Sequence, residues 1–162
     1  MARPSFLAAW TASQKIYDAF NPADKVAEVI GGVVAINIRH PTQPWENTCA
    51  VRMSYILNQT GTYIPAIANK TVTGKDRRNY FYRVNDLADF LCRHWGKPKI
   101  IKYPPSNALI GQKGIILFEV RGWSTASGHA TLYDGNSCYD HCYFNEREAN
   151  YQTTKAYFWK LS

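Results

Sequence analysis

The sequence predicts an α+β fold, with helices in the first half of the chain and an antiparallel sheet in the second. Apolar residues recur at helical spacing in several stretches before Gly96. After Gly114 the pattern changes to short runs of β-branched and aromatic residues separated by turn residues. The 162 residues contain no repeat and no linker, so we expect one domain that spans residues 1–162.

The chain is expected to begin with two helices and an extended segment. Residues 5–19 carry one apolar stripe, with Ser5 positioned to cap the helix. Asn21-Pro22 supplies a cap and a first-turn proline for the second helix, which Gly31-Gly32 ends. The β-branched residues within 33–38 predict an extended segment.

A cysteine lies at the start of the next predicted helix, which runs to about Asn58. Residues 40–44 form a loop before it, and Asn47 or Thr48 is positioned to cap it. A helix N-terminus carries about half a positive charge, which stabilises a thiolate and lowers the pKa of the thiol. Cys49 is therefore a candidate nucleophile, although its position alone suits a buried structural cysteine equally well.

Residues 61–84 are the least regular part of the sequence and predict a long surface excursion. They contain the densest basic cluster, Lys75 to Arg78, which we expect in a solvated loop. Asn85 is positioned to cap a further amphipathic helix, which Gly96 ends. The residues expected in the core from this helix are Leu87, Phe90, Leu91, Cys92 and Trp95.

The second half of the chain predicts short strands joined by turns. The expected strands cover residues 99–103, 115–120, 129–133, 138–144 and 156–161, and a short helix is expected at residues 104–112. Because strands that follow one another through short turns pair antiparallel, these runs predict an antiparallel sheet.

Asp134-Gly135 is the strongest hairpin signal in the chain, because both central positions of a type I′ turn need a positive φ. With a two-residue loop, Tyr133 pairs with Asn136 and paired residue numbers sum to 269. His129 then lies opposite Asp140 on the same face, with Cβ atoms roughly 4.5–5.5 Å apart. Asp134, the competing carboxylate, lies in the turn. Two alternatives stay open: a longer loop shifts this register, or His129 is a hydrogen-bonded core residue.

These stretches supply a set of three groups that can act together in nucleophilic catalysis. They are a cysteine at a helix start, a histidine on a strand and an acid on the neighbouring strand. In such a set a thiolate attacks a carbonyl, the histidine transfers the proton to the leaving amine, and the acid fixes the histidine tautomer. The chain order Cys, His, Asp and the helix-then-sheet layout resemble those of papain-like cysteine hydrolases.

Two motifs carry a closer resemblance. Asn47-Thr48-Cys49-Ala50-Val51-Arg52-Met53-Ser54 and Ser127-Gly128-His129-Ala130-Thr131-Leu132-Tyr133-Asp134-Gly135 resemble the fourth family of type VI secretion amidase effectors, antibacterial toxins with a fold similar to the NlpC/P60 cell-wall peptidases. The resemblance spans nearly the whole chain. It implies Cys49 as the nucleophile, His129 as the base and Asp140 as the orienting acid, in a mechanism that needs no cofactor and no metal ion.

The resemblance also implies a substrate, a route and a partner. The reaction would be hydrolysis of the amide between D-glutamate and meso-diaminopimelate in peptidoglycan stem peptides. The type VI secretion machinery would deliver the protein from the cytoplasm into a neighbouring cell's periplasm, and a cognate immunity protein would block the active site. We expect no signal peptide, because Gln14, Lys15 and Asp18 interrupt any early apolar run. Trp45, Asn47 and the 124–128 loop are nearest in sequence to the candidate catalytic residues Cys49 and His129.

Cys138 and Cys142 are a candidate disulfide. Four residues along a strand place their Cα atoms roughly 13 Å apart, beyond the limit of about 7 Å for a disulfide. A bridge therefore requires the chain to bend after Asp140, and both states stay open from the residues alone. If formed, the bridge would support the loop beside Asp140 and would suit an oxidising compartment.

The net charge of +7 favours anionic partners, and three other functions compete with the amidase. A housekeeping or phage-derived NlpC/P60 murein endopeptidase would use the same chemistry. A basic nucleic-acid-binding module would use Lys75 to Arg78 and would not need Cys49. A zinc site would use Cys138, His141 and Cys142, with His40, although their spacing matches no common ligand pattern. We expect no nucleic-acid partner, and no membrane span because no run of about twenty apolar residues occurs.

Overall fold

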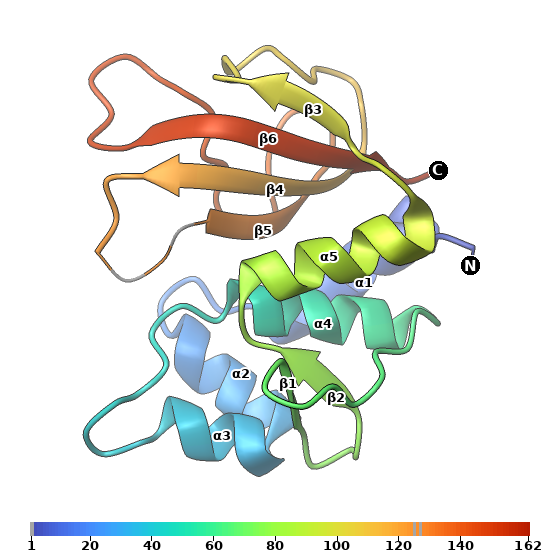
Figure 1. Cartoon of the computed structure of the whole chain (residues 1–162), viewed down its shortest axis with the longest axis vertical. Helices are drawn as coiled ribbons and strands as arrows, with labels where there is room; N and C mark the ends of the chain where they lie inside the picture. Colours follow the sequence, from blue (N-terminus) through green and yellow to red (C-terminus); the bar gives the residue numbers. More distant parts are fainter. Residues whose placement is uncertain (1, 125, 127) are drawn as a thin grey trace.

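The computed structural model describes residues 2–124, 126 and 128–162, and it has an α+β architecture (Figure 1). A four-stranded sheet forms one side of the molecule, and helices with a small hairpin form the other. The two chain ends lie close together, where the Phe6 N–H donates to the Ser162 carbonyl at 2.7 Å. The predicted fold class is thus confirmed at the level of a mixed fold with antiparallel sheets.

The first two predicted helices are present as α1 (Phe6–Ile16) and α2 (Pro22–Ile30). Ser5 caps α1, since its hydroxyl accepts from the Ala8 N–H at 3.1 Å. Asn21 precedes α2 but makes no side-chain capping bond. Helix α1 is three residues shorter than predicted, because Tyr17 is already extended.

The strand predicted at residues 33–38 is wrong, because this segment is the helix α3 (Gly32–Ile38). Val34, Ala35 and Ile38 are buried together at helical spacing, and this packing outweighs the β-propensity of valine and isoleucine. Gly32 permits the turn between the helices, since φ is +58° and an added Cβ would lie 2.6 Å from the Gly74 carbonyl carbon.

Helix α4 (Cys49–Gln59) runs through the centre of the molecule and packs against α1, β2 and β5. Every residue from Cys49 to Asn58 is buried. Because this helix is covered on all sides, its first turn is held rigidly beside the sheet, and that is where the candidate nucleophile lies.

The long surface excursion predicted for residues 61–84 is only partly correct. The segment contains a hairpin of β1 (Thr71–Thr73) and β2 (Asn79–Phe81), which contributes Tyr80 and Phe81 to the core. The Phe81 N–H donates to Ser54 on α4 at 2.9 Å. The basic cluster, residues 75–78, lies exposed between these strands as expected.

Helix α5 (Val84–Trp95) contains the predicted buried residues Leu87, Phe90, Leu91 and Trp95, and Gly96 ends it with φ +83°. Two details of the prediction are wrong. Arg83 occupies the N-cap position, so Asn85 lies inside the first turn and does not cap. Cys92 is exposed, because one residue beyond Leu91 is a turn of about 100° around the helix, away from the core.

The main sheet contains β3 (Lys99–Lys102), β4 (Gly114–Arg121), β5 (Gly128–Tyr133) and β6 (Gln152–Lys160). All neighbours pair antiparallel in the order β3-β6-β4-β5, which confirms four of the five predicted strands. The helix predicted at residues 104–112 is wrong, because Ala108 and Gln112 donate to the carbonyls of Pro105 and Leu109 in isolated turns.

The strand predicted at residues 138–144 is also wrong. Asp134 Oδ1 accepts from the N–H groups of Asn136 and Ser137, which extends the loop to four residues, 134–137. Tyr133 therefore bridges Cys138 and not Asn136, so paired numbers sum to 271 and not to 269. Beyond this bridge the chain is irregular. Among the described residues, no helix is long and apolar enough to cross a membrane.

Candidate active site

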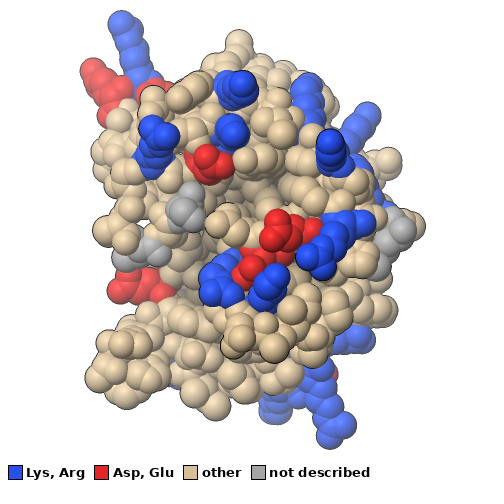
Figure 2. Space-filling model, in the orientation of Figure 1, with Lys and Arg blue, Asp and Glu red and all other residues tan. Residues whose placement is uncertain are grey.

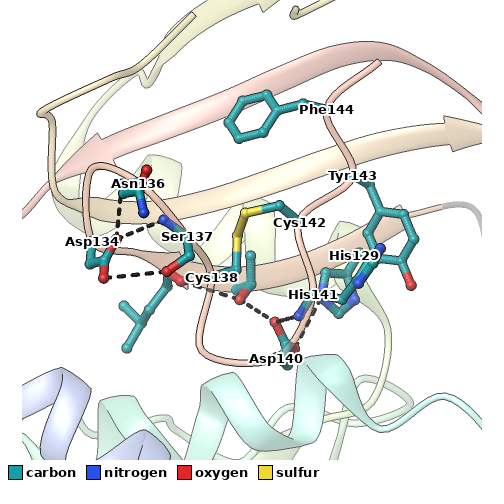
Figure 3. Close-up of a disulfide and its surroundings, with 12 residues drawn as sticks. His129, Asp134, Asn136, Ser137, Cys138, Asp140, His141, Cys142, Tyr143 and Phe144 are labelled. Atoms are coloured by element: carbon teal, nitrogen blue, oxygen red, sulfur yellow. Dashed lines mark hydrogen bonds and ion pairs between the residues drawn. A yellow bond between two sulfur atoms is a disulfide. The ribbon is translucent and has the colours of Figure 1, made fainter. Parts of the chain in front are cut away.

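The structure brings together the three residues predicted to carry the chemistry. Cys49 starts α4. His129 is the second residue of β5, and Asp140 follows the hairpin loop, as Figure 3 shows. His129 Nε2 lies 3.0 Å from Asp140 Oδ2, and their side chains are 9% and 2% exposed. Because β5 packs against α4, the imidazole faces the first turn of that helix.

Asp140 reaches His129 although the predicted register is wrong. With paired numbers summing to 271, Asp140 lies across from Thr131, whose hydroxyl donates to Asp140 Oδ1 at 2.5 Å. His129 and Thr131 are two residues apart on one strand, so they share a face. The carboxylate therefore meets the imidazole diagonally, which is a normal neighbour contact on a sheet face.

Asp140 is an ionised group in a nearly closed site. Its carboxylate accepts from the His141 N–H at 2.6 Å and from Arg52 Nη2 at 2.8 Å. Burial opposes ionisation, but the charges of His129 and Arg52 and the hydrogen bonds from His129 and Thr131 hold the pKa of Asp140 well below its usual range.

The environment of His129 favours the imidazolium form. Burial alone would lower its pKa, but the charge of Asp140, the hydrogen bonds with Asp140 and Cys49, and the charge of Cys49 raise it to about 9. Nε2 lies 3.0 Å from Asp140 Oδ2, so the imidazolium and the carboxylate form a close ion pair. Because Nε2 faces the carboxylate, Nδ1 is the nitrogen left to exchange a proton with the thiol.

Cys49 is buried and is a stronger acid than an ordinary thiol. Burial raises its pKa, but the hydrogen bond and charge of His129, a backbone hydrogen bond from Ala130 and the charge of Arg52 together lower it. The Cys49 N–H donates to Asn47 Oδ1 at 3.1 Å, so Asn47 and not Thr48 makes the side-chain bond at the helix start. The pair can therefore exist as thiolate and imidazolium.

An open cleft of about 850 Å³ gives access to Cys49. One wall carries the stacked rings of Trp45 and Tyr82, whose centroids are 5.1 Å apart, and the ion pair of Arg83 with Asp86 at 2.7 Å. Figure 2 shows this face hollowed near its centre, with basic and acidic side chains around the hollow. Among the residues expected near the chemistry, those that line the cleft are Trp45, Asn47, Ala126 and Gly128. Residues 125 and 127 lie outside the described residues.

A family model for amidase effector protein 4 of the type VI secretion system, Tae4, matches residues 45–159. The chain belongs to the Tae4 family. It is similar to Tae4 of Salmonella typhimurium solved with the immunity protein Tai4 of Enterobacter cloacae, with 38% identity and a TM-score of 0.87 over 99% of this chain and 100% of that one. It is also similar to Tae4 of Enterobacter cloacae solved with Tai4, with 36% identity and a TM-score of 0.89 over the same shares. A comparison with curated proteins gave no match.

This Tae4-family chain joins Cys138 and Cys142 in a disulfide, with Cα atoms 5.3 Å apart. The irregular path after Tyr139 supplies the bend that such a bridge requires. Asp140 lies inside the five-residue loop that the disulfide closes, next to His129 in Figure 3. The zinc site considered above needs both cysteines as thiolates, and the disulfide removes them.

The sequence analysis did not identify Arg52, which joins Cys49, His129 and Asp140 as the fourth charged group of a buried cluster. It lies one helical turn after Cys49, its side chain is 7% exposed, and it forms the ion pair with Asp140. A usable signal was present: an arginine in an otherwise apolar helix needs a buried partner. Its partner lies 88 residues away in the sequence, so the pairing could not be assigned before the fold was known.

Proposed function

We propose that this protein is a cysteine amidase that hydrolyses the amide between D-glutamate and meso-diaminopimelate in peptidoglycan stem peptides. Membership of an amidase effector family supports the reaction class. The observation that carries the cysteine mechanism is the buried His129–Asp140 ion pair beside the buried Cys49, whose thiol pKa the hydrogen bond and charge of His129 lower. In this proposal residues 1–162 act as one amidase domain with a papain-like arrangement, in which the nucleophile starts a central helix packed on an antiparallel sheet.

The first half of the proposed reaction is acylation of the enzyme. The Cys49 thiolate attacks the γ-carbonyl carbon of D-glutamate, a carbon–sulfur bond forms, and the carbonyl electrons move to oxygen. His129 then donates its proton to the nitrogen of diaminopimelate as the carbon–nitrogen bond breaks. The raised pKa of His129 keeps this proton available at neutral pH.

The second half is hydrolysis of the thioester. Neutral His129 takes a proton from water as the water oxygen bonds to the acyl carbon, and the carbon–sulfur bond breaks to restore thiolate and imidazolium. Asp140 keeps the ring oriented and stabilises its cation in both halves. The proposed oxyanion site includes the Cys49 N–H, which the substrate oxygen must take over from Asn47.

The wider biology is proposed from the relatives. Tae4 structures from two organisms hold the immunity protein Tai4. We expect the present chain to be delivered by the type VI machinery, to act in the periplasm of the target cell, and to be inhibited by a cognate immunity protein. Expression of the protein directed to the periplasm should lyse the host cell. Expression in the cytoplasm, or periplasmic expression of Cys49→Ala, should not.

A defined peptide tests the proposed bond. L-Ala-γ-D-Glu-meso-diaminopimelate should be cleaved to L-Ala-D-Glu and free diaminopimelate, and the α-linked isomer should stay intact. His129→Gln should abolish cleavage without changing the fold. Cleavage of the α-linked isomer at an equal rate, or of the peptide by Cys49→Ala, would contradict the proposal.

A further inference from the structure

All three guanidinium nitrogens of Arg52 donate a hydrogen bond inside the protein. Nη2 donates to Asp140 at 2.8 Å, Nη1 donates to the Thr48 hydroxyl at 3.0 Å, and Nε donates to the Tyr139 hydroxyl at 3.1 Å. The face of the group also lies over the Tyr17 ring, 5.1 Å from its centroid. The residue is only 6% exposed, so these contacts replace its hydration.

These contacts link two segments of the site that are far apart in the sequence. Thr48 directly precedes the nucleophile on α4, whereas Tyr139 and Asp140 lie in the irregular segment after β5. That segment has no ladder of strand hydrogen bonds to fix it. A planar guanidinium with its donors in fixed directions can hold three acceptors in one geometry, which a lysine ammonium cannot.

We propose that Arg52 is a positioning residue that fixes Asp140 against His129 and ties this carboxylate to the helix turn that carries Cys49. This role rests on the proposed cysteine amidase function. Arg52 touches neither the scissile bond nor the attacking atom, and it acts through Asp140 and the first turn of α4.

The charges around the cluster give Arg52 a second effect. With thiolate, imidazolium, carboxylate and guanidinium, the buried group is neutral overall. Without the guanidinium charge, Asp140 acts on His129 alone, so the pKa of His129 rises. The charge of Arg52 also lowers the pKa of Cys49, so its removal raises the pKa of this thiol. The titratable and charged groups that face the cluster are Tyr17, which directly follows α1, Cys49 and Arg52 from α4, His129 from β5, and Tyr139, Asp140 and Tyr143 from the segment after β5.

The test compares Arg52→Lys and Arg52→Gln with Arg93→Gln, which changes an exposed arginine on α5. All variants carry Cys92→Ser, so that alkylation by iodoacetamide reports Cys49 alone. Far-ultraviolet circular dichroism and thermal unfolding check the fold. The two readouts are the pH profile of alkylation and kcat and KM for the tripeptide.

Arg52→Lys should keep the positive charge and lose the fixed directions of the three hydrogen-bond donors. We expect kcat to fall by roughly 10²-fold, as for a misplaced catalytic group, with KM and the alkylation profile nearly unchanged. Arg52→Gln should lose both, and the acid limb of alkylation should move up by about one pH unit. Arg93→Gln should match the parent in each assay.

A folded Arg52→Lys with parental kcat overturns the positioning role, and this variant decides the matter if Arg52→Gln does not fold. An unchanged alkylation profile in a folded Arg52→Gln overturns the charge effect. Alkylation needs no substrate. A parent protein that shows the expected alkylation profile but cleaves no peptide would therefore refute the proposed reaction, whereas the charge effect of Arg52 on Cys49 would still be decided by the alkylation profile of Arg52→Gln.

Discussion

Replacing Asp140 with asparagine tests how the protein tunes His129. Burial lowers the pKa of this histidine, and the charge of Asp140 is the largest of the effects that raise it from 6.5 to about 9. Asparagine keeps the size of the side chain and removes the charge. The pKa of His129 should then fall to its ordinary value or below, because burial is opposed only by Cys49.

The size of the effect follows from these values. At pH 7.5 an imidazole with a pKa of 9 is roughly 97% protonated, whereas one with a pKa of 6.5 is roughly 10% protonated. The supply of imidazolium thus falls about tenfold, and loss of an orienting carboxylate costs up to about 10⁴-fold in serine hydrolases. We expect kcat/KM at pH 7.5 to fall by at least about 10²-fold. Arg52 would also lose its buried partner, which costs about 3–5 kcal/mol of unfolding free energy.

The assay is kcat/KM for the tripeptide between pH 5 and pH 10, with unfolding measured in parallel. The alkaline limb should move from near 9 to below about 7 in Asp140→Asn. Asp134→Asn is the matched control, because it changes a carboxylate in the hairpin loop just before Asp140, and this carboxylate accepts hydrogen bonds from its own turn. A folded Asp140→Asn whose alkaline limb stays near 9 would refute this account of His129.

Three further predictions concern the disulfide, the helix start and pH. Cys138→Ser, or reduction of the bridge to Cys142, should cost about 2 kcal/mol of stability for a five-residue loop and lower kcat, since Asp140 lies inside that loop; equal kcat for both redox states would contradict it. Asn47→Ala should cost about 1 kcal/mol in urea unfolding and retain kcat within about threefold, because it removes a cap and frees the Cys49 N–H; a large loss of kcat with unchanged stability would oppose this. In Cys49→Ala the unfolding free energy should fall as pH rises above 6.5, because the charge of Asp140 still raises the pKa of His129 on folding, and the stability present below the unfolded pKa is lost as pH rises through the folded pKa. The fall should stay below the roughly 3 kcal/mol that a shift from 6.5 to about 9 would give, because this variant lacks the Cys49 contribution; a flat profile would contradict it.

The helix start and the histidine strand were predictable because local signals determine them. The predicted hairpin loop was too short by two residues, and side chains on a strand alternate with a period of two. An error of two in the register sum, 269 against 271, keeps Asp140 on the same face as His129. An error of one would have placed it on the opposite face.

The missed features depend on tertiary contacts. Residues 33–38 have strand-forming side chains, yet they fold as a helix because Val34 and Ile38 pack into the core. The bend that lets Cys138 meet Cys142 begins where the observed strand pairing stops, at the Tyr133–Cys138 bridge, and no local pattern marks that point. Arg52 pairs with Asp140 across 88 residues. Each of these needs the relative positions of distant segments.

Digestion of purified meso-diaminopimelate-type peptidoglycan by the wild type and by Cys49→Ala, with products identified by mass spectrometry, tests the central claim most directly. The account predicts fragments that end at D-glutamate, with the diaminopimelate amine newly freed, from the wild type only. The same fragments from folded Cys49→Ala, or intact stems after treatment with folded wild type that has Cys49 reduced and the Cys138–Cys142 bridge intact, would contradict it.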